Sequence, residues 1–173
     1  MGEIKTQRPQ RRRRGRKGFN ICALCLFFAA FAFKSLLYYT EIMKFVPMEK
    51  KIINCKEAPA PIGPYNQAVM VNDTLYISGQ ICIDQSTGML KNKDIQEETH
   101  QVMQNLRTIL HEARMSFSNV VKTTIFITDM QQFGEINEVY GKYFEGDFPA
   151  RETVQVSALP KFVNVEISMI AVR

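Results

Sequence analysis

Residues Val163–Val172 alternate between two sets of side chains, which is the pattern of a β-strand. One set is wholly apolar and comprises Val163, Val165, Ile167, Met169 and Ala171. The other set also carries apolar side chains, Ile170 and Val172, beside Asn164, Glu166 and Ser168. A run of β-forming residues, Thr153–Ala158, precedes this segment, and Leu159-Pro160-Lys161 separates the two. Two successive strands are therefore predicted in this region.

Helical spacing occurs twice. Residues 94–115 repeat apolar side chains at the helical period, at Ile95, Val102, Met103, Leu106, Ile109, Leu110 and Ala113. Asp94 and Glu97 have the spacing of a capping box. Residues 131–144 carry a second stripe, which comprises Phe133, Ile136, Tyr140, Tyr143 and Phe144. Asn137 lies on the side of this stripe, where its amide either ties down a loop or reaches a ligand.

Four shorter strands are predicted, at Lys51–Asn54, Gln67–Val71, Thr74–Ser78 and Val121–Thr128. Asn72-Asp73 reads as a hairpin turn, and Gly79 indicates a bulge or a close backbone approach. The Pro- and Gly-rich residues 57–66 form a stiff loop, whose Tyr65 belongs either to a pocket wall or to an ordered surface connection. The order of these elements predicts an α+β fold, a single sheet with both helices on one face.

The face of the sheet without helices is expected to be partly apolar, because Ile170 and Val172 lie on it. A contiguous apolar patch on a protein surface usually marks an interface. We therefore predict an oligomer of closed symmetry that packs through this face.

Arg151 and Glu166 stand out in the apolar region that contains the last two strands. A carboxylate in a strand with two largely apolar faces is costly to bury unless it is paired or hydrogen-bonded. One interpretation is a structural Arg–Glu pair or an exposed edge. The other is a site in which Arg151 holds an anionic substrate and Glu166 acts on water. The pattern of residues alone leaves both open.

The charge is distributed unevenly along the chain. Residues 1–47 carry a net charge of +8 and residues 48–173 a net charge of −3, within a total of +5. A mildly acidic body argues against a large surface that follows a phosphate backbone, so no specific nucleic-acid partner is expected.

Residues 1–47 form an N-terminal extension, and the domain is expected to begin at Met48. A basic tail precedes an uncharged apolar stretch at 19–33, which Lys34 interrupts. This stretch is shorter than the roughly 20 residues that span a membrane. The extension is a targeting sequence for an organelle (mitochondrion or plastid), a membrane anchor through residues 19–39, or a non-native start upstream of a cytoplasmic protein. A membrane is a partner only if the segment is retained.

Metal ligands are not expected. Cys22 and Cys25 form a C-x-x-C pair without a second pair, inside an apolar run. His100 and His111 are about three helical turns apart and cannot share an ion. Free thiols in a reducing compartment are the default.

Several motifs resemble one known family. Pro149-Ala150-Arg151, Val154, Leu159-Pro160 and Val165-Glu166-Ile167 are similar to the C-terminal pattern of the RidA (YjgF/YER057c) family. Ile62-Gly63-Pro64-Tyr65 and Ile77-Ser78-Gly79-Gln80 match its N-terminal pattern. The motifs stand in the family's order and together cover residues 48–173.

The resemblance implies a chorismate-mutase-like fold, arranged as a homotrimer with sites in clefts between subunits. It also implies a hydrolase of the 2-iminobutanoate/2-iminopropanoate deaminase type, which converts reactive enamines and imines such as 2-aminoacrylate to 2-keto acids and ammonia. These substrates leak from pyridoxal-phosphate-dependent dehydratases, so the role is metabolite damage control. No metal or organic cofactor is implied.

By position, the resemblance implies that Arg151 holds the substrate carboxylate and that Glu166 is the general base for water. The other implied substrate-binding residues are Tyr65, Ser78, Gly79, Asn137 and Thr153. Thr153 replaces a cysteine that many members have, and its backbone carbonyl is expected to help hold the water. Glu152 replaces a small or apolar residue, and strand alternation predicts that it faces away from the pocket.

Two other functions compete with hydrolysis of imines. An endoribonuclease or translation inhibitor, reported under the same family name, needs a phosphate-binding surface that the acidic body does not favour. A non-catalytic trimer that binds small carboxylates or a partner protein needs only Arg151, whereas Glu166 favours catalysis.

Overall fold

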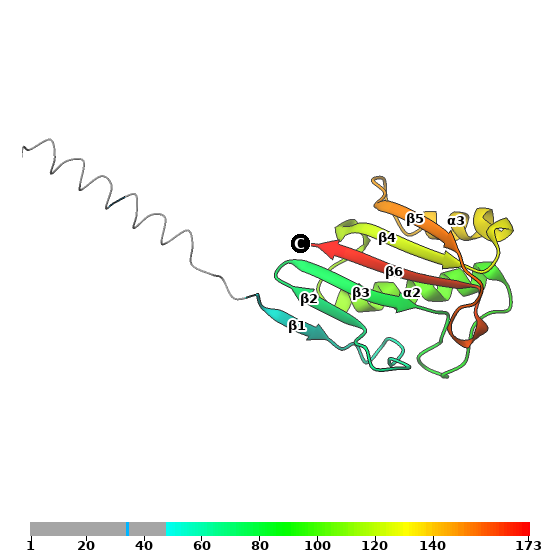
Figure 1. The fold of residues 1–173 in the computed structure, drawn as a ribbon, viewed down its shortest axis with the longest axis horizontal. Helices are drawn as coiled ribbons and strands as arrows, with labels where there is room; N and C mark the ends of the chain where they lie inside the picture. Colours follow the sequence, from blue (N-terminus) through cyan, green and yellow to red (C-terminus); the bar gives the residue numbers. More distant parts are fainter. Residues whose placement is uncertain (1–33, 35–47) are drawn as a thin grey trace, which may run out of the picture. The chain divides into compact units, whose positions relative to one another are not determined.

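The computed structural model describes residue 34 and residues 48–173, and the latter are built on one six-stranded sheet (Figure 1). Across the sheet the strands follow the order β1-β2-β3-β6-β4-β5. Their bounds are Lys50–Ile53 (β1), Ala68–Val71 (β2), Thr74–Gln80 (β3), Val120–Ile127 (β4), Ala150–Gln155 (β5) and Val165–Val172 (β6). In this part of the chain β4 and β5 are parallel, and the other neighbouring strands are antiparallel. The sheet is therefore mixed.

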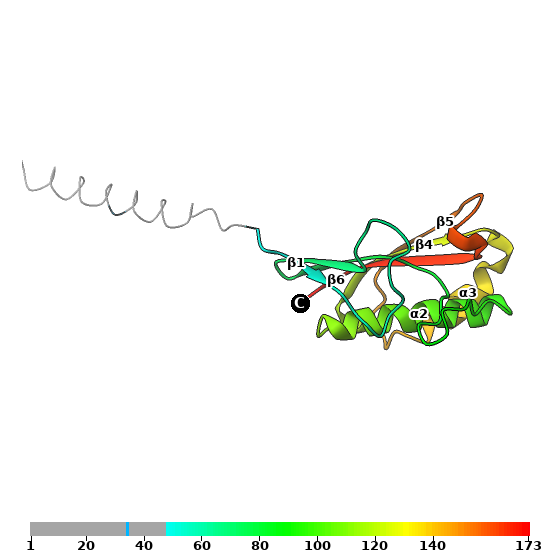
Figure 2. The ribbon, with the colours of Figure 1, turned by 90° about the horizontal axis from the view of Figure 1, so that it is seen from below.

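Two α-helices, Ile95–Glu112 (α2) and Phe133–Gly141 (α3), pack on the same face of this sheet (Figure 2). Short 3₁₀ turns lie at Phe117–Asn119, Met130–Gln132 and Pro160–Phe162. The predicted α+β class, one sheet with both helices on one face, is confirmed. The second helix is shorter than the predicted 131–144 at both ends: its first residues form the 3₁₀ turn at Met130–Gln132, and the helix already ends at Gly141.

The capping box of α2 differs from the expected one in its second arm. The carboxylate of Asp94 accepts from the backbone N–H of Glu97 at 2.8 Å, as expected. The carboxylate of Glu97 accepts from the N–H of Lys93 at 3.1 Å instead of that of Asp94. Both arms still satisfy N–H groups at the helix start.

The alternation of Val163–Val172 is realised as predicted. Every second side chain is buried beneath the helices, namely Val163, Val165, Ile167, Met169 and Ala171. On the opposite face Glu166, Ser168 and Ile170 are half-buried and Val172 is exposed. β6 therefore contributes one face to the core and leaves the other face without a helix.

The prediction for the preceding strand was wrong in its bounds. β5 spans Ala150–Gln155 rather than Thr153–Ala158, so Arg151 lies inside the strand and not before it. β5 is an edge strand, and its extent is set by its parallel pairing with β4, from Lys122↔Ala150 to Ile127↔Gln155. Local β-propensity is weak against such long-range pairing.

The helix-free face combines apolar and charged side chains. Exposed apolar residues on it include Ile52, Tyr76, Val154 and Val172. On the same face Glu152 accepts from the ammonium of Lys122 at 2.6 Å and from the hydroxyl of Thr124 at 2.8 Å. This face is thus less purely apolar than β6 alone suggested.

The interpretations of residues 1–47 lie outside the residues that the structure describes, apart from Lys34. Among the described residues, no helix combines the length and the apolar character needed to cross a membrane.

Candidate active site

Glu166 lies on β6, on the helix-free face, next to the irregular end of β3. The register between β3 and β6 shifts between Ile77 and Gln80, which forms a bulge around Gly79. A Cβ added to Gly79 would overlap the Oε1 atom of Glu166 and lie 2.7 Å from its Cδ atom. Real Cβ atoms do not approach other atoms so closely. The close approach predicted at Gly79 is therefore present, and it leaves room for the carboxylate of Glu166.

The environment of Glu166 changes its acidity. The side chain is half-buried, and this burial raises the pKa of the Glu166 carboxyl above its ordinary value of 4.5. A carboxyl group with a raised pKa exchanges protons more readily near neutral pH, which suits a general base or acid.

A cavity of about 280 Å³ opens beside Glu166. It is lined by Ile62, Tyr65, Ser78, Gly79, Ile81, Pro160 and Glu166. The structure thus brings together four of the predicted site residues, Tyr65, Ser78, Gly79 and Glu166. The walls are mostly apolar, so the cavity suits a small substrate with few polar groups beyond those that react.

The loop that carries Tyr65 is held from inside by Gln67. Its amide nitrogen donates to the carbonyls of Cys55 (3.0 Å), Ala58 (3.2 Å) and Pro59 (2.8 Å), and its oxygen accepts from the N–H of Cys55 at 2.6 Å. Gln67 is buried, so these bonds are made away from water. Gln67 was not predicted to support the site, although a glutamine at the start of a predicted strand was a signal of local anchoring.

Arg151 lies in a different environment on the edge strand β5. Its guanidinium donates to the side-chain oxygen of Asn137 at 2.6 Å. The Cζ atom lies 5.0 Å from the ring centre of Tyr140 and 5.5 Å from that of Phe133, which are cation–π distances. A cavity of about 390 Å³ adjoins this group, lined by Asn137, Tyr140, Gly141, Phe148, Pro149 and Arg151.

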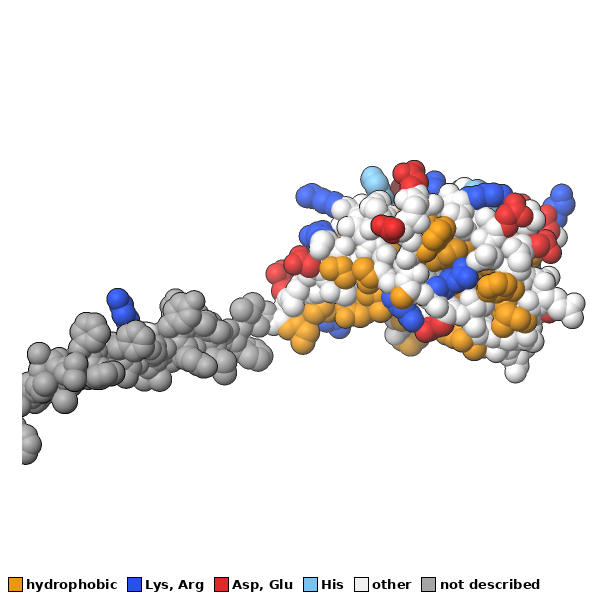
Figure 3. Space-filling model, turned by 90° about the horizontal axis from the view of Figure 1, so that it is seen from above, with side chains coloured by type: hydrophobic (Ala, Val, Ile, Leu, Met, Phe, Trp, Pro, Cys, Tyr) orange, Lys and Arg blue, Asp and Glu red, His pale blue; other side chains and the backbone are white. Residues whose placement is uncertain are grey.

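Asn137 therefore positions Arg151 and points toward the same cavity. Tyr140, which sequence reasoning assigned only to the core, gives Arg151 an aromatic surface. Its hydroxyl donates to Thr123 at 3.2 Å, which fixes the ring on the helix side of the sheet. Viewed from the side of β5 and α3, basic side chains lie among hydrophobic patches (Figure 3).

Arg151 and Glu166 point to opposite faces of the sheet. Arg151 pairs with the buried Thr123, on the helix side, whereas Glu166 pairs with Phe126, on the other side. β4 also lies between the two strands that carry them. One copy of the chain therefore does not bring the two charges together, and the alternative of a structural Arg151–Glu166 pair within the chain is excluded.

Glu152 and Thr153 directly follow Arg151 on β5. Glu152 faces away from Arg151, as alternation predicted, and is paired with Lys122. The hydroxyl of Thr153 is buried and has no hydrogen-bond partner among the described residues. Thr153 is not among the residues that line either cavity of the single chain. Its contact with a substrate therefore stays a prediction.

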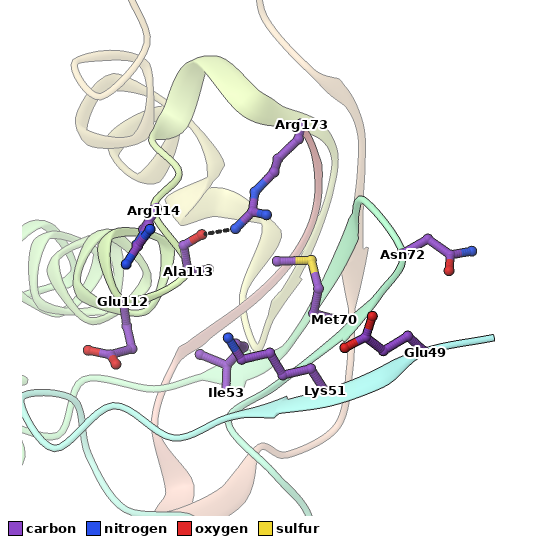
Figure 4. Close-up of a pocket in the computed structure, with 9 residues that line it drawn as sticks. All are labelled: Glu49, Lys51, Ile53, Met70, Asn72, Glu112, Ala113, Arg114 and Arg173. Atoms are coloured by element: carbon purple, nitrogen blue, oxygen red, sulfur yellow. Dashed lines mark hydrogen bonds between the residues drawn. The ribbon is translucent and has the colours of Figure 1, made fainter. Parts of the chain in front are cut away.

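A larger cavity, of about 530 Å³, lies at the other end of the sheet (Figure 4). None of the predicted site residues lines it. Its charged side chains are of both signs: Glu49, Lys51, Glu112, Arg114 and Arg173. The guanidinium of Arg173 donates to the carbonyl of Ala113 at 2.8 Å, and this bond, drawn as a dashed line in Figure 4, ties down the end of α2. Size alone does not make this cavity a reaction site.

In the part of the chain that the structure describes, no group of three or more His, Cys, Asp or Glu side chains is arranged to hold an ion. Cys82 is one of two free cysteines among the described residues, and it is fully buried. Burial together with the nearby Glu98 raises the pKa of the Cys82 thiol to about 12, so this thiol is a poor nucleophile.

The fold and these residues define a known family. The family model described as "Endoribonuclease L-PSP" matches residues 55–173, and the chain belongs to this family, which is the RidA/YjgF family that the motifs indicated. Among its curated relatives is a 2-iminobutanoate/2-iminopropanoate deaminase of Mus musculus, 50% identical over 124 residues, which are 72% of this chain and 92% of the mouse protein.

Solved structures agree with this assignment. A Rid-family protein of unknown function from Yersinia pestis has a TM-score of 0.70 and 48% identity, over 72% of this chain and 100% of that one. Escherichia coli TdcF with bound serine has a TM-score of 0.69 and 40% identity, over 71% of this chain and 98% of that one.

Proposed function

We propose that this protein is an enzyme that hydrolyses reactive imines and their enamine tautomers, such as 2-iminobutanoate and 2-aminoacrylate, to 2-keto acids and ammonia. The observation that carries the proposal is the half-buried carboxyl of Glu166, seated against Gly79 at the wall of a small, mostly apolar cavity. Curated relatives from mouse, rat and human that bear the name 2-iminobutanoate/2-iminopropanoate deaminase support it.

The complete site is formed by two copies of the chain in a homotrimer. Arg151 and Glu166 lie on opposite faces of one sheet, beside separate cavities. A cleft in which the Arg151 cavity of one copy meets the Glu166 cavity of the next combines an anion holder with a base. The exposed apolar side chains of the helix-free face supply the contact area for such an assembly.

In this cleft Arg151 holds the substrate carboxylate, and Asn137 keeps the guanidinium oriented. Glu166 removes a proton from a water molecule, whose oxygen attacks the imine carbon. The resulting tetrahedral adduct carries one hydroxyl and one amino group. The amino group of this adduct contains the proton that Glu166 took from water and passed to the nitrogen. Glu166 then moves the hydroxyl proton to the amino group, the C–N bond breaks, and ammonia leaves as the C=O bond forms. The sum is one imine plus one water to one keto acid plus one ammonia.

An enamine substrate requires one earlier step. Its terminal carbon gains a proton while an N–H proton is lost, which gives the imine without a change of oxidation state. The raised pKa of Glu166 means that the carboxyl is more often protonated near neutral pH than an exposed glutamate, so it is able to donate this proton.

The substrates come from pyridoxal-phosphate-dependent dehydratases, which release such enamines, and the cycle described above needs no cofactor. The site of action is the cytoplasm. An organelle or a membrane surface is the alternative if residues 1–47 act as a targeting sequence or an anchor. Sequencing the N-terminus of the mature protein distinguishes these locations.

A ribonuclease is the second candidate, because the family model bears an endoribonuclease description. The net charge of −3 on residues 48–173 disfavours it. A non-catalytic binder of small carboxylates is the third, and the serine bound to TdcF is consistent with it. A binder of this kind has no use for the raised pKa of Glu166.

The test uses the full-length chain. An amino acid oxidase supplies 2-iminobutanoate, and the release of ammonia is compared with the spontaneous rate. Acceleration in proportion to the added protein supports the proposal. No acceleration, together with serine binding that is lost in Arg151→Ala, identifies a binding module instead. RNA cleavage without imine hydrolysis identifies the ribonuclease.

The shared site is tested by mixing. At substrate concentrations below the KM of the wild type, Glu166→Gln and Arg151→Ala are each expected to be nearly inactive. When the two are dissociated and reassembled together, about a quarter of the sites combine an intact Arg151 with an intact Glu166, if the two come from different copies. Recovery of roughly that share of activity supports the shared site, and no recovery contradicts it.

A further inference from the structure

Glu98 is a carboxylate in the protein interior that the reaction above does not use. It lies in the first turn of α2 and has no solvent exposure. A buried carboxylate is costly unless several donors satisfy it. Here one oxygen accepts from the backbone N–H groups of Asn164 (2.6 Å) and Val165 (3.0 Å), and the other accepts from the side-chain amide of Asn164 (3.0 Å). All three bonds end on the two residues that precede Glu166.

Asn164 links this carboxylate to the next strand. Its backbone carbonyl accepts from the N–H of Thr128 at 3.1 Å, and its side-chain oxygen accepts from the Thr128 hydroxyl at 3.1 Å. Thr128 directly follows β4. The group of Glu98, Asn164 and Thr128, here termed the Glu98 clamp, therefore joins α2, β4 and the start of β6.

The clamp acts where the sheet gives β6 the least support. The pairing of β3 with β6 ends at Gln80↔Ile167, so Val165 and Glu166 have no partner on β3. A few residues earlier, Lys161 and Phe162 adopt positive φ values of 56° and 57°, which non-glycine residues adopt rarely. Apart from the clamp, the start of β6 is held by its pairing with β4, by the burial of Val163 and Val165 in the core, and by the connection that follows Pro160.

We propose that Glu98 is a positioning residue for catalysis: by fixing the backbone of Asn164 and Val165, it sets where the carboxylate of Glu166 lies beside Gly79. This inference rests on the proposed function. Glu166 has little tolerance for displacement, since its carboxylate already fills the space that a Cβ at residue 79 would need. A shift of about 1 Å in a reacting group costs up to roughly 100-fold in rate.

A purely structural role for Glu98 makes a different prediction. A buried charge is weak evidence of stability, because well-packed apolar groups often serve as well. A structural carboxylate affects activity only through the fraction of folded protein. A positioning carboxylate affects kcat in the folded enzyme and leaves KM nearly unchanged, because Arg151, which holds the substrate, lies on another strand and the other face.

The experiment compares Glu98→Ala, Glu98→Gln and Asn164→Ala with the wild type in the full-length chain. Steady-state kinetics give kcat and KM, and thermal melting and solution mass report folding and assembly. We expect Glu98→Ala to lower kcat about tenfold or more with KM within about threefold, and Asn164→Ala to lower kcat less. The amide introduced by Glu98→Gln keeps an acceptor for both backbone N–H groups, so this variant should restore most of the rate.

Glu97→Ala is the matched control. Glu97 lies in the same helical turn and is exposed, and its carboxylate accepts from the backbone N–H of Lys93 rather than from β6. Its loss should lower the melting temperature with kcat within about twofold of wild type. If Asn164→Ala and any folded Glu98→Ala protein keep kcat within twofold, or lose activity only as they unfold or dissociate, the inference is wrong.

A wild-type protein without imine hydrolysis refutes the proposed function, which is a separate outcome. In that case crystal structures of wild type and Asn164→Ala test whether the Glu98 clamp positions Glu166. A displaced Glu166 carboxylate in the variant supports the positioning role, and an unchanged one refutes it.

Discussion

The Glu166 cavity and the Arg151 cavity differ in how firmly each holds its charged group. Glu166 lies half-buried on a central strand, and its carboxylate fills the space that the missing side chain of Gly79 leaves. Arg151 lies on an edge strand, exposed, and is held by one amide and two aromatic rings. Glu166, the proposed base, is thus fixed by the sheet, whereas Arg151, the proposed holder of the substrate carboxylate, is reachable from outside. We therefore expect substitutions around Glu166 to act on kcat and substitutions around Arg151 to act on KM.

The largest effect should come from Glu166→Gln. The amide is nearly the same size as the carboxylate, so the fold is kept, but it accepts no proton from water. We expect kcat to fall by about 10²–10⁴, as for other general bases. Ammonia release under saturating imine measures this, and Arg151→Lys, which keeps the charge but not the bidentate geometry, should mainly raise KM. A rate within a few fold of wild type would remove Glu166 from the chemistry.

Gly79→Ala should have the second largest effect on kcat. The new methyl group collides with the carboxylate of Glu166 and forces it out of place. We expect kcat to fall by roughly 100-fold, because the base moves by about 1 Å or more. Gly134→Ala in α3 is the control, since nothing lies within 4 Å of its added Cβ, and it should leave kcat unchanged. Equal effects of both substitutions would mean that room for Glu166 is not the reason for glycine at 79.

A smaller effect concerns pH. Burial raises the folded-state pKa of Glu166, so its favourable contribution to stability is complete below the unfolded pKa and is lost as the pH rises through the folded pKa. Glu166→Gln stays neutral and avoids this loss. The melting temperature of Glu166→Gln should therefore rise relative to that of the wild type as the pH increases from about 4 to 8. In the same range kcat/KM of the wild type should rise, as the base becomes deprotonated.

Glu152 serves as the contrast in this pH series. Its hydrogen bonds from Lys122 and Thr124 lower its pKa, so its contribution to stability is present above the unfolded pKa and is lost as the pH falls through the folded pKa. The melting temperature of Glu152→Gln should therefore fall relative to that of the wild type as the pH rises. If the two variants shift in the same direction, burial of Glu166 is not the cause of its pH dependence.

The smallest effect is expected from Glu152→Ser. Glu152 is next to Arg151 in sequence, but it is paired with Lys122 on the opposite face of β5. Its removal should change the rate of imine hydrolysis by less than about tenfold, because it does not compete for the guanidinium. An increase of tenfold or more would show that Glu152 weakens substrate binding at Arg151.

Local features of this site could be predicted from the sequence, and long-range ones could not. Alternation placed Glu152 away from Arg151, and the glycine at 79 signalled the close approach that admits Glu166. The separation of Arg151 from Glu166 depends on the parallel register of β4 and β5, which no local pattern specifies. Glu98 looked like an ordinary acidic residue of a first helical turn, because its partners lie 66 and 67 residues away.

The central place of β6 also affects how the chain folds. β6 is the last strand in sequence, yet it separates β3 from β4 and is hydrogen-bonded to both. The hairpins formed by β1, β2 and β3 leave one edge of β3 unpaired until residues 165–172 are in place. The edge of β4 that faces away from β5 is likewise unpaired until then. Folding should therefore be slow for the size of the domain, since it must wait for contacts distant in sequence. A chain interrupted before residue 165 would present two unpaired strand edges, and such edges promote aggregation.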